Sequence, residues 1–528
     1  MRDAHDVAKV RAAEAELMAA LPDGALMQRA AAGLASVCST LLGRVYGSRV
    51  AVLAGSGDNG GDALYAGAQL ARRGAAVVAV AAGSRTHEGG ATALRASGGR
   101  IVTSADPAAG PAITRADLIL DGMLGIGGKG GLRDPYAGLA ALAARSAATV
   151  VAVDLPSGID ADTGAVDGAA VRADVTVTFG TWKPGLLVDP GAAHAGVAEL
   201  IDIGLGPHLE AADVVSAQAA DVAAMLPSPT ADSDKYRRGV IGVVSGSEQF
   251  TGAAVLSVGG AIRGGAGMVR FVSAQPAVDV VRQWWPEAVI TVLPSEPGGG
   301  GSRFAGTAED FLASAGRVQA WVAGPGMGTG DDSAELLLAV LRTDLPVLVD
   351  ADGLTVLAEH RGFLPRAAPT LITPHAGELA RLTGADRGDI EAQRLRHARE
   401  AARQLGVTVL LKGSTTVICP PPGSPGPDLV NSTGTPWLAT AGSGDVLSGL
   451  AGSLLAQGLA PAEAAQAAAF LHGVAARRAA AGDPDGVGPE AGAGVDEAAG
   501  DASVIDGAPI GAADILRALP GAIRAIRS

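Results

Sequence analysis

Short apolar runs alternate with segments of helical period in two series along this 528-residue chain, and a looser acidic stretch, LPSPTADSD, separates the series. Alternating strands and helices form parallel, doubly wound sheets. The sequence therefore predicts an α/β fold of two three-layer αβα domains, residues 1–225 and 226–528. The predicted strands are 49–54, 76–81, 118–120, 149–154 and 174–179 in the first series, and 240–245, 268–273, 320–323, 346–350, 370–373 and 408–412 in the second.

Several helices can also be placed by their apolar period. The segment up to Leu42 predicts one or two amphipathic helices, with Leu21-Pro-Asp-Gly24 as the break. A long helix pair is predicted from Val446 to Ala480, and a last helix from Ala512 to Arg527. Between them, residues 482–507 are rich in Gly, Ala and Asp, which is typical of a mobile insertion.

Charge and cysteine content exclude several classes of protein. The net charge of −14 without any basic run argues against a nucleic-acid partner. No apolar run reaches spanning length, and the charged, helical N-terminus is unlike a signal peptide, so no membrane partner is expected. Cys38 and Cys419 lie too far apart for metal spacing, which favours a reducing cytoplasm. We expect small-molecule substrates and a homo-oligomer.

Polar residues follow three strands of the first series. The segment Gly55-Ser-Gly-Asp-Asn-Gly60 has the G-x-G-x-x-G spacing, but its acidic loop would repel a pyrophosphate and suits a hard cation or a sugar hydroxyl better. Asn59, Asp121 and Ser157 could supply oxygen ligands to a monovalent cation, which leaves Asp154 for substrate or acid–base chemistry. The alternative is that these residues only cap helices.

In the second series, Gly442-Ser-Gly-Asp445 leads directly into an apolar helix. Glycines at a helix start let backbone N–H groups close on an anion, and the helix dipole adds positive potential there. An Asp at that point suits a hydroxyl that loses its proton as a phosphoryl group arrives. The alternative is a glycine-rich turn capped by Asp.

Only five of the 40 basic residues are lysines, so a lysine marks a position where a compact ammonium can matter. Lys412 opens the segment Lys412-Gly-Ser-Thr-Thr416 after a predicted strand, which offers an ammonium, N–H groups and hydroxyls to a nucleotide. Codon bias is the alternative explanation for the few lysines.

The motifs GSGDNGGDA, DGMLGIG, VDLPSGIDADTG and TFGTWKPG resemble the NAD(P)H-hydrate epimerase domain over about residues 1–225. The resemblance implies a potassium site and a hydrate site, with Asp154 as a catalytic contact; the family often has Asn where this chain has Asp58, and Lys183 matches a family lysine. The implied K⁺ ligands are Asn59, Asp121 and Ser157, and the implied hydrate contacts are Asp58, Asn59, Gly60, Gly61, Asp62 and Asp154.

The motifs KYRRG, GSEQFTGAAVLSVGGAIRGGAG, AGPGMG, VDADGL, LITPHAGE and LLKGSTTVI, in this order, resemble the ribokinase-like, ADP/ATP-dependent NAD(P)H-hydrate dehydratase domain. The resemblance implies Mg²⁺, ADP as phosphoryl donor and Asp445 as catalytic base. The glycine-rich segments around Ala253 and Gly326 are expected to be turns that admit a flat ring. The implied hydrate contacts are Ala253, Gly326, His375 and Asp445, and the implied nucleotide contacts are Lys412, Gly413, Ser414, Thr415, Thr416 and Gly444.

Both resemblances together imply repair of hydrated NADH and NADPH. The first domain would interconvert the R and S hydrates, and the second would dehydrate the S form at the expense of ADP. The alternative is a small-molecule kinase of the same superfamily whose N-terminal domain is a non-catalytic interaction module. The product separates the two, because a kinase releases a stable phosphate ester.

Overall fold

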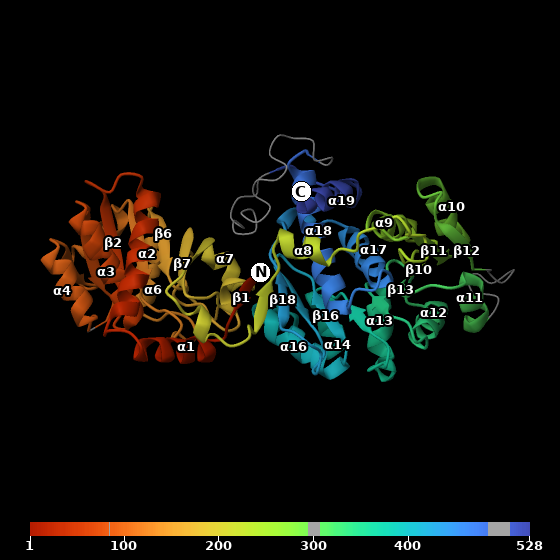
Figure 1. Cartoon of the computed structure of the whole chain (residues 1–528), viewed down its shortest axis with the longest axis horizontal. Helices are drawn as coiled ribbons and strands as arrows, with labels where there is room; N and C mark the ends of the chain where they lie inside the picture. Colours follow the sequence, from red (N-terminus) through yellow and green to blue (C-terminus); the bar gives the residue numbers. More distant parts are fainter. Residues whose placement is uncertain (84, 294–306, 484–506) are drawn as a thin grey trace. The chain divides into compact units, whose positions relative to one another are not determined.

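The computed structural model describes residues 1–83, 85–293, 307–483 and 507–528 (Figure 1). Residues from Arg2 to Val215 form one compact unit, and the residues from Ser216 onward form the other. Helix α8, Ala219–Met225, belongs to the second unit because Val222 is buried in its core. The predicted mobile insertion at 482–507 lies outside the described residues, apart from its ends.

The N-terminal unit is built on one parallel sheet with the strand order β4-β3-β2-β5-β6-β7-β8. In this register Leu53 pairs with Asp121 and Asp121 with Ala152, so the ends of the central strands meet at one edge. The strands are β2 Arg49–Ala54, β3 Ala76–Ala81, β4 Arg100–Thr103, β5 Leu118–Gly122, β6 Thr149–Val153, β7 Val175–Phe179 and β8 Val197–Ile201.

Helices cover both faces of this sheet, because successive residues of each strand point to opposite sides. Val50 and Val52 pack into one apolar cluster with the helices α2 and α3, whereas Ala51 and Leu53 pack into a second with α5 and α6. The helices are α1 Val7–Ala19, α2 Ala25–Leu42, α3 Asp58–Arg72, α4 Glu88–Ala96, α5 Ala109–Thr114, α6 Tyr136–Ala143 and α7 Gly191–Ala195.

The C-terminal unit contains a larger, mixed sheet with the order β18-β17-β16-β15-β14-β13-β10-β11-β12. It is parallel from β16 to β12, and β17 and β18 are antiparallel to their neighbours. The strands are β10 Val240–Val244, β11 Met268–Ser273, β12 Val289–Val292, β13 Ala320–Ala323, β14 Val347–Val349, β15 Thr370–Ile372, β16 Thr408–Leu411, β17 Thr416–Cys419 and β18 Asp428–Asn431.

One face of this sheet carries the helices α9, α17, α18 and α19, which share a core with Ile241, Val322 and Leu410 (Figure 1). On the opposite face Trp321 meets Phe311 of α11. The helices are α9 Thr251–Arg263, α10 Gln275–Trp284, α11 Ala308–Ala315, α12 Asp331–Leu341, α13 Asp352–Glu359, α14 Ala376–Thr383, α15 Arg387–Ala392, α16 Arg394–Leu405, α17 Ser443–Ala456, α18 Pro461–Ala480 and α19 Ala512–Arg527.

The fold prediction of two αβα domains is therefore confirmed, and each strand of the two predicted series is present. The prediction missed several short strands. These are β4, β8, β12, β17 and β18, together with β1 Arg2–Ala4 and β9 Val214–Ser216. Short 3₁₀ turns occur at Pro184–Leu186, Gly206–His208, Arg361–Phe363 and Pro436–Leu438.

Each unit holds one free cysteine in its interior. Cys38 lies on α2 and Cys419 on β17, and both are 0% exposed. Burial raises the pKa of Cys38 to about 12 and raises the pKa of Cys419 well above its usual range. Among the described helices, α2 alone is long and apolar enough to cross a membrane by length and composition; its buried residues, Leu34 among them, belong to the N-terminal core.

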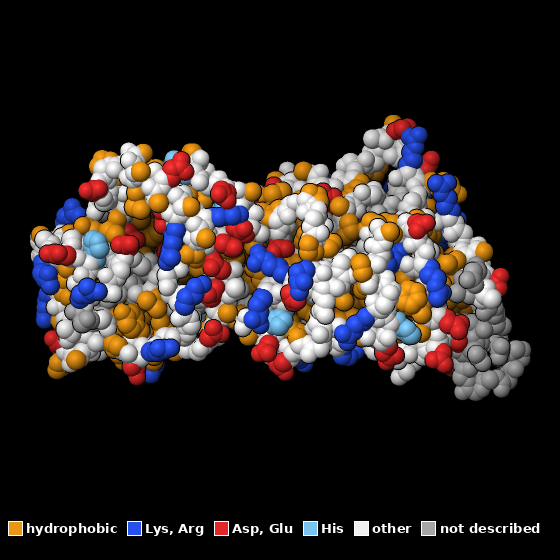
Figure 2. Space-filling model, turned by 90° about the horizontal axis from the view of Figure 1, so that it is seen from below, with side chains coloured by type: hydrophobic (Ala, Val, Ile, Leu, Met, Phe, Trp, Pro, Cys, Tyr) orange, Lys and Arg blue, Asp and Glu red, His pale blue; other side chains and the backbone are white. Residues whose placement is uncertain are grey.

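On the face drawn in Figure 2, basic and acidic side chains are interspersed, and they do not gather into a basic stripe.

Candidate active sites

The helix after β2 begins earlier than the sequence predicted, inside the glycine-rich segment. Asp58 already opens α3, so Asn59, Gly60 and Asp62 lie in the first turns of a helix and not in a loop. An acidic residue suits the positive end of the helix dipole, which favours this earlier start. A Cβ on Gly60 would lie 2.3 Å from the carbonyl oxygen of Gly55, so this glycine is required for the close approach of the two backbones.

Gly61 is buried in the same way: an added Cβ would lie 2.9 Å from Cγ of His87. The structure thus gives Gly60 and Gly61 a packing role. That they also contact a substrate remains a prediction.

Asp121 and Ser157 meet at the ends of β5 and β6. The Asp121 carboxylate accepts hydrogen bonds from the backbone N–H of Ser157 at 2.8 Å and from its hydroxyl at 2.7 Å. Asn59 lies beside the segment that follows Asp121: a Cβ on Gly122 would be 3.0 Å from its backbone oxygen and a Cβ on Gly125 3.0 Å from its amide oxygen, and Leu124 in the same segment donates to the Ser157 hydroxyl. The three residues that the sequence suggested as cation ligands are therefore close to one another.

The residues at this point fit a cation. Asp121 is 0% exposed, and burial raises its pKa to about 6 against the lowering effect of the Ser157 and Met123 hydrogen bonds. None of the described residues that bond Asp121 is basic, so a cation would compensate its buried charge. The amide nitrogen of Asn59 is buried without a partner, and exchanging it with the oxygen would present a ligand atom.

Asp154 and Lys183 form a buried ion pair. The Lys183 ammonium donates to Asp154 Oδ1 at 2.5 Å, to the Thr178 hydroxyl at 3.0 Å and to the Phe179 carbonyl at 3.0 Å. The backbone of Asp154 has a φ of 66°, a left-handed conformation that is strained for an aspartate and frequent at functional sites. The Thr178 hydroxyl and the Phe179 N–H also donate to Oδ1, so one oxygen of the carboxylate takes all three of these bonds.

A cavity of about 320 Å³ lies next to this pair. It is lined by Glu14 of α1, by Asp58 and Asp62 of α3, by Phe179 and by the α1–α2 connection. Burial, reinforced by Asp154, raises the pKa of Glu14, and burial with the neighbouring carboxylates raises the pKa of Asp62 well above its usual range. Glu14 could not be predicted from the sequence, because a single acidic residue on an amphipathic helix carries no signal.

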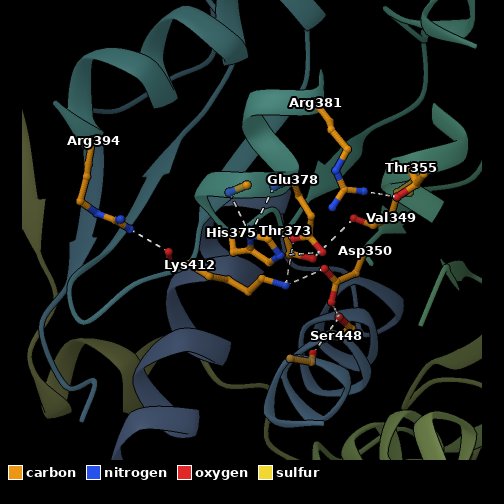
Figure 3. Close-up of polar contacts among 12 residues, drawn as sticks. Val349, Asp350, Thr355, Thr373, His375, Glu378, Arg381, Arg394, Lys412 and Ser448 are labelled. Carbon is orange, nitrogen blue, oxygen red and sulfur yellow. Dashed lines mark hydrogen bonds and ion pairs between the residues drawn. The ribbon is translucent and has the colours of Figure 1, made fainter. Parts of the chain in front are cut away.

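The second site lies at the ends of β14 and β16. The Lys412 ammonium donates to Asp350 Oδ1 at 2.8 Å and lies 3.6 Å from Glu378 Oε2 (Figure 3). Burial lowers the pKa of Lys412, but the attraction of Asp350 and Glu378 outweighs it, so the pKa lies above its usual range. Lys412 is therefore a charged group at the carboxyl edge of the sheet.

His375 and Glu378 form the start of α14. The His375 ring nitrogen Nδ1 accepts from the N–H groups of Gly377 and Glu378, and Glu378 accepts from the His375 N–H at 2.7 Å. Nδ1 is thus an acceptor, and Nε2 lies 3.5 Å from Glu378 Oε1 on a side chain that is 53% exposed. Burial and the Lys412 ammonium lower the pKa of His375 against the opposing effect of Glu378.

Gly444 and Asp445 lie in the first turn of α17, as predicted, behind Gly442 with a φ of 85°. A Cβ on Gly444 would lie 3.3 Å from the Lys412 ammonium, so the helix start and the lysine border the same space. Burial, Asp350 and other carboxylates raise the pKa of Asp445 to about 7 against the effect of Lys412. Asp445 therefore has the protonation behaviour of a general base that works near neutrality.

The segment from Gly413 to Thr416 connects the antiparallel strands β16 and β17. Gly413 and Ser414 are exposed, whereas Thr415 and Thr416 are buried. The buried Arg394 packs against Gly413 and donates to the carbonyl of Lys412 at 2.8 Å (Figure 3). Backbone groups and Ser414 are thus the exposed part of the predicted nucleotide segment.

Ala253 lies inside α9 and not in a turn, which corrects the expectation from its glycine-rich segment. Small and apolar residues can continue the helix there, because the tertiary contacts of α9 outweigh the low helix propensity of glycine. Gly326 does lie in a turn, with a φ of 61°, and a Cβ on it would be 2.7 Å from Cβ of Ala253. The two residues therefore border one another.

No group of three or more His, Cys, Asp or Glu side chains suited to a metal occurs among the described residues. Mg²⁺ commonly binds through substrate phosphates and one or two carboxylates, and an ion held in that way needs no such group.

Two separate α/β units, each with a lysine–carboxylate pair at the carboxyl ends of its strands, define a two-site enzyme for small molecules. Residues 241–489 match the family model described as NAD(P)H-hydrate dehydratase, and residues 23–185 match the one described as YjeF-related protein N-terminus.

The chain is 47% identical over 490 residues to the bifunctional NAD(P)H-hydrate repair enzyme of Mycobacterium leprae, which covers 92% of this chain and 95% of the relative. It is 35% identical to the enzyme of that name from Moorella thermoacetica, over 89% of this chain and 90% of the relative. The chain therefore belongs to the bifunctional NAD(P)H-hydrate repair enzyme family, with an epimerase and a dehydratase part.

A solved structure of ADP/ATP-dependent NAD(P)H-hydrate dehydratase from Bacillus subtilis, co-crystallised with ATP/Mg²⁺, is 28% identical. It has a TM-score of 0.41 and covers 49% of this chain and 87% of that chain.

Proposed function

We propose that the chain repairs hydrated NADH and NADPH, with residues 1–225 as the epimerase domain and residues 226–528 as the dehydratase domain. The first domain interconverts the R and S hydrates, and the second returns the S hydrate to NAD(P)H while ADP becomes AMP and phosphate. The observation that carries the proposal is the Lys412 ammonium beside the first turn of α17, where Asp445 has a pKa of about 7. Family membership favours this function over a plain small-molecule kinase.

The dehydratase reaction needs a phosphoryl acceptor and a leaving group. Asp445 takes the proton of the hydrate hydroxyl, and that oxygen forms a bond to the terminal phosphorus of ADP as the bond to AMP breaks. The ring nitrogen then expels phosphate, and loss of a proton from the neighbouring ring carbon restores the dihydropyridine. Lys412 and the N–H groups at the start of α17 stabilise the charge on the phosphoryl oxygens.

The remaining predicted contacts have complementary roles. The 413–416 segment, of which Gly413 and Ser414 are exposed, holds the nucleotide together with Gly444, and His375, Ala253 and Gly326 hold the hydrate. Mg²⁺ would bind with the nucleotide phosphates.

In the N-terminal site, epimerisation requires the hydroxyl at one ring carbon to leave and water to return on the opposite face. Asp154, positioned by Lys183, passes a proton to the hydroxyl as it leaves as water and takes a proton back from the water that returns on the opposite face. Asn59, Asp121 and Ser157 would hold K⁺, and its charge would compensate the buried carboxylate of Asp121. The turn from Asp58 to Asp62 contacts the hydrate.

The test uses the full chain with S-NADH hydrate, ADP and Mg²⁺. The absorbance of reduced nicotinamide should return, with AMP and phosphate in equal amounts. A stable phosphate ester without returning absorbance would establish a kinase instead. Starting from the R hydrate, absorbance should return at a rate that depends on the N-terminal site, which tests the epimerase.

We further propose a homo-oligomer that acts on these small molecules in the cytoplasm, without nucleic-acid or membrane partners. Light scattering on the purified chain tests the oligomeric state, and fractionation of the source cells tests the location.

A further inference from the structure

Asp350 has no role among the contacts assigned so far, although it is the most deeply buried carboxylate at the C-terminal site. It is 1% exposed and follows β14 directly. One of its oxygens accepts from the Lys412 ammonium at 2.8 Å and the other from the Ser448 hydroxyl at 2.6 Å (Figure 3). A buried carboxylate with two such partners has a fixed orientation, because both of its oxygens are engaged.

The backbone around Asp350 is also constrained. Ala351 has a φ of 51°, which is strained for alanine, and a Cβ on Gly324 would lie 1.9 Å from the Asp350 carbonyl oxygen. Strain of this kind persists only where surrounding contacts enforce it, and it is frequent at active sites.

Ser448 connects Asp350 to the start of α17. Its hydroxyl lies 3.0 Å from the carbonyl oxygen of Gly444, one turn earlier on the same helix. A Cβ on Gly444 would be 3.7 Å from Asp350 Oδ2 and 3.3 Å from the Lys412 ammonium. Asp350, Ser448 and Lys412 thus form a chain of contacts that fixes where the ammonium stands relative to Gly444.

We propose that Asp350, held by Ser448, is a positioning residue that aims the Lys412 ammonium at the first turn of α17, where the phosphoryl group arrives. The inference rests on the proposed dehydratase function. Asp350 touches neither substrate nor nucleotide in this role; it acts through Lys412. A lysine has four rotatable bonds, and an ammonium displaced by about 1 Å would lose much of its effect on the transition state.

Asp350 also contributes to the charge around Asp445. The groups that face Asp445 are Asp350, Asp352, Glu378 and Lys412, and the buried His472 of α18 lies close by, with a pKa that burial lowers to about 4. Removal of the Asp350 charge should therefore lower the pKa of Asp445, since the carboxylate raises it and since Lys412 would lose its nearest counter-ion.

The test compares Asp350→Asn with the full wild-type chain in the dehydratase assay. We expect kcat to fall by about 10²-fold, with a much smaller rise in the KM for ADP. The acid limb of the kcat profile should move to lower pH. Thermal unfolding of the same preparation reports whether the C-terminal unit is folded, and epimerase activity, which belongs to the other unit, should be unchanged.

The variant Ser448→Ala tests the orientation of the Asp350 carboxylate separately from its charge. It keeps every charge, so the acid limb should stay in place while kcat falls by roughly 3- to 10-fold for one lost hydrogen bond. Ser453→Ala is the matched control: Ser453 is another buried serine of α17, but its hydroxyl bonds the Leu450 carbonyl, and the variant should retain wild-type kcat.

The outcomes are distinguishable. Wild-type kcat and an unmoved acid limb in Asp350→Asn would overturn the inference while the proposed function stands. If Asp350→Asn does not fold, equal kcat in Ser448→Ala and Ser453→Ala would overturn it. Failure of the wild-type chain to restore reduced nicotinamide would instead refute the proposed function itself.

Discussion

Asp445 lies at the start of α17 near other carboxylates, and burial together with these charges raises its pKa to about 7. Asp445→Asn keeps the size and removes the base, so the dehydratase rate should fall by about 10²- to 10⁴-fold. ADP binding should survive, because a negative charge near the phosphates is gone. Assays of rate, ADP affinity and epimerisation on one purified variant test this. Joint loss of ADP binding and activity would show a structural cap instead of a base.

The same residue predicts a pH dependence. Because the pKa of Asp445 is about 7, the base is ionised above that pH and protonated below it. Dehydratase kcat should therefore fall tenfold for each pH unit below about 6, with the midpoint near 7. A flat profile between about pH 5 and 8 would mean that another group takes the proton.

Lys412 tests whether a compact charge is required. The ammonium fits between Asp350 and the space beside Gly444, where a planar guanidinium is larger. Lys412→Arg should raise the KM for ADP and lower kcat by about tenfold or more, although the net charge is unchanged. Unchanged nucleotide kinetics would mean that only charge matters there.

Asp121 links cation binding to stability. Its folded pKa of about 6 lies above the ordinary value, so the stability that its protonated form contributes is lost as pH rises from about 4 to 6. The proposed K⁺ would bind the ionised form. The temperature of half-inactivation of the epimerase should therefore rise by a few degrees with KCl at about pH 7.5 and much less at about pH 5. Tetramethylammonium chloride and Asp121→Ala are the controls; an equal effect of both salts would exclude the site.

At the scale of elements, most of the candidate site residues follow the carboxyl ends of strands, and most of those strand ends were predicted from the sequence. β2, β5, β6, β14 and β16 were recognisable as apolar runs followed by polar residues. The short strands β17 and β18 were not, because four residues without alternation carry little signal.

Contacts between residues far apart in the chain could not be predicted from the sequence either. The pair of Asp350 and Ser448 is separated by 98 positions, and only the folded chain shows that they meet. The start of α3 was likewise misplaced, because a run of glycines is typical of a loop until tertiary packing enforces a helix.

The β2–α3 turn offers a prediction at this scale. Gly60→Ala places a Cβ 2.3 Å from the Gly55 carbonyl oxygen and should destabilise the N-terminal unit by about 1–3 kcal/mol. Gly57→Ala, three residues earlier, meets nothing within 4 Å and has an extended backbone, so it should be nearly neutral. Epimerase half-inactivation temperatures measure both. Equal values would mean that the turn relaxes freely.

At the scale of the whole molecule, two units with separate sheets and cores carry two activities on one chain. Each core contains one buried thiol, Cys38 in the first and Cys419 in the second. Each buried thiol is therefore a natural probe of how often its own unit opens. An alkylating reagent can modify either thiol only while its own half transiently opens, so peptide mapping of labelled protein over time would give two separate opening rates without any engineered probe. Addition of K⁺ should slow the labelling of Cys38 alone, and ADP that of Cys419 alone; a shared response would show that the halves open together.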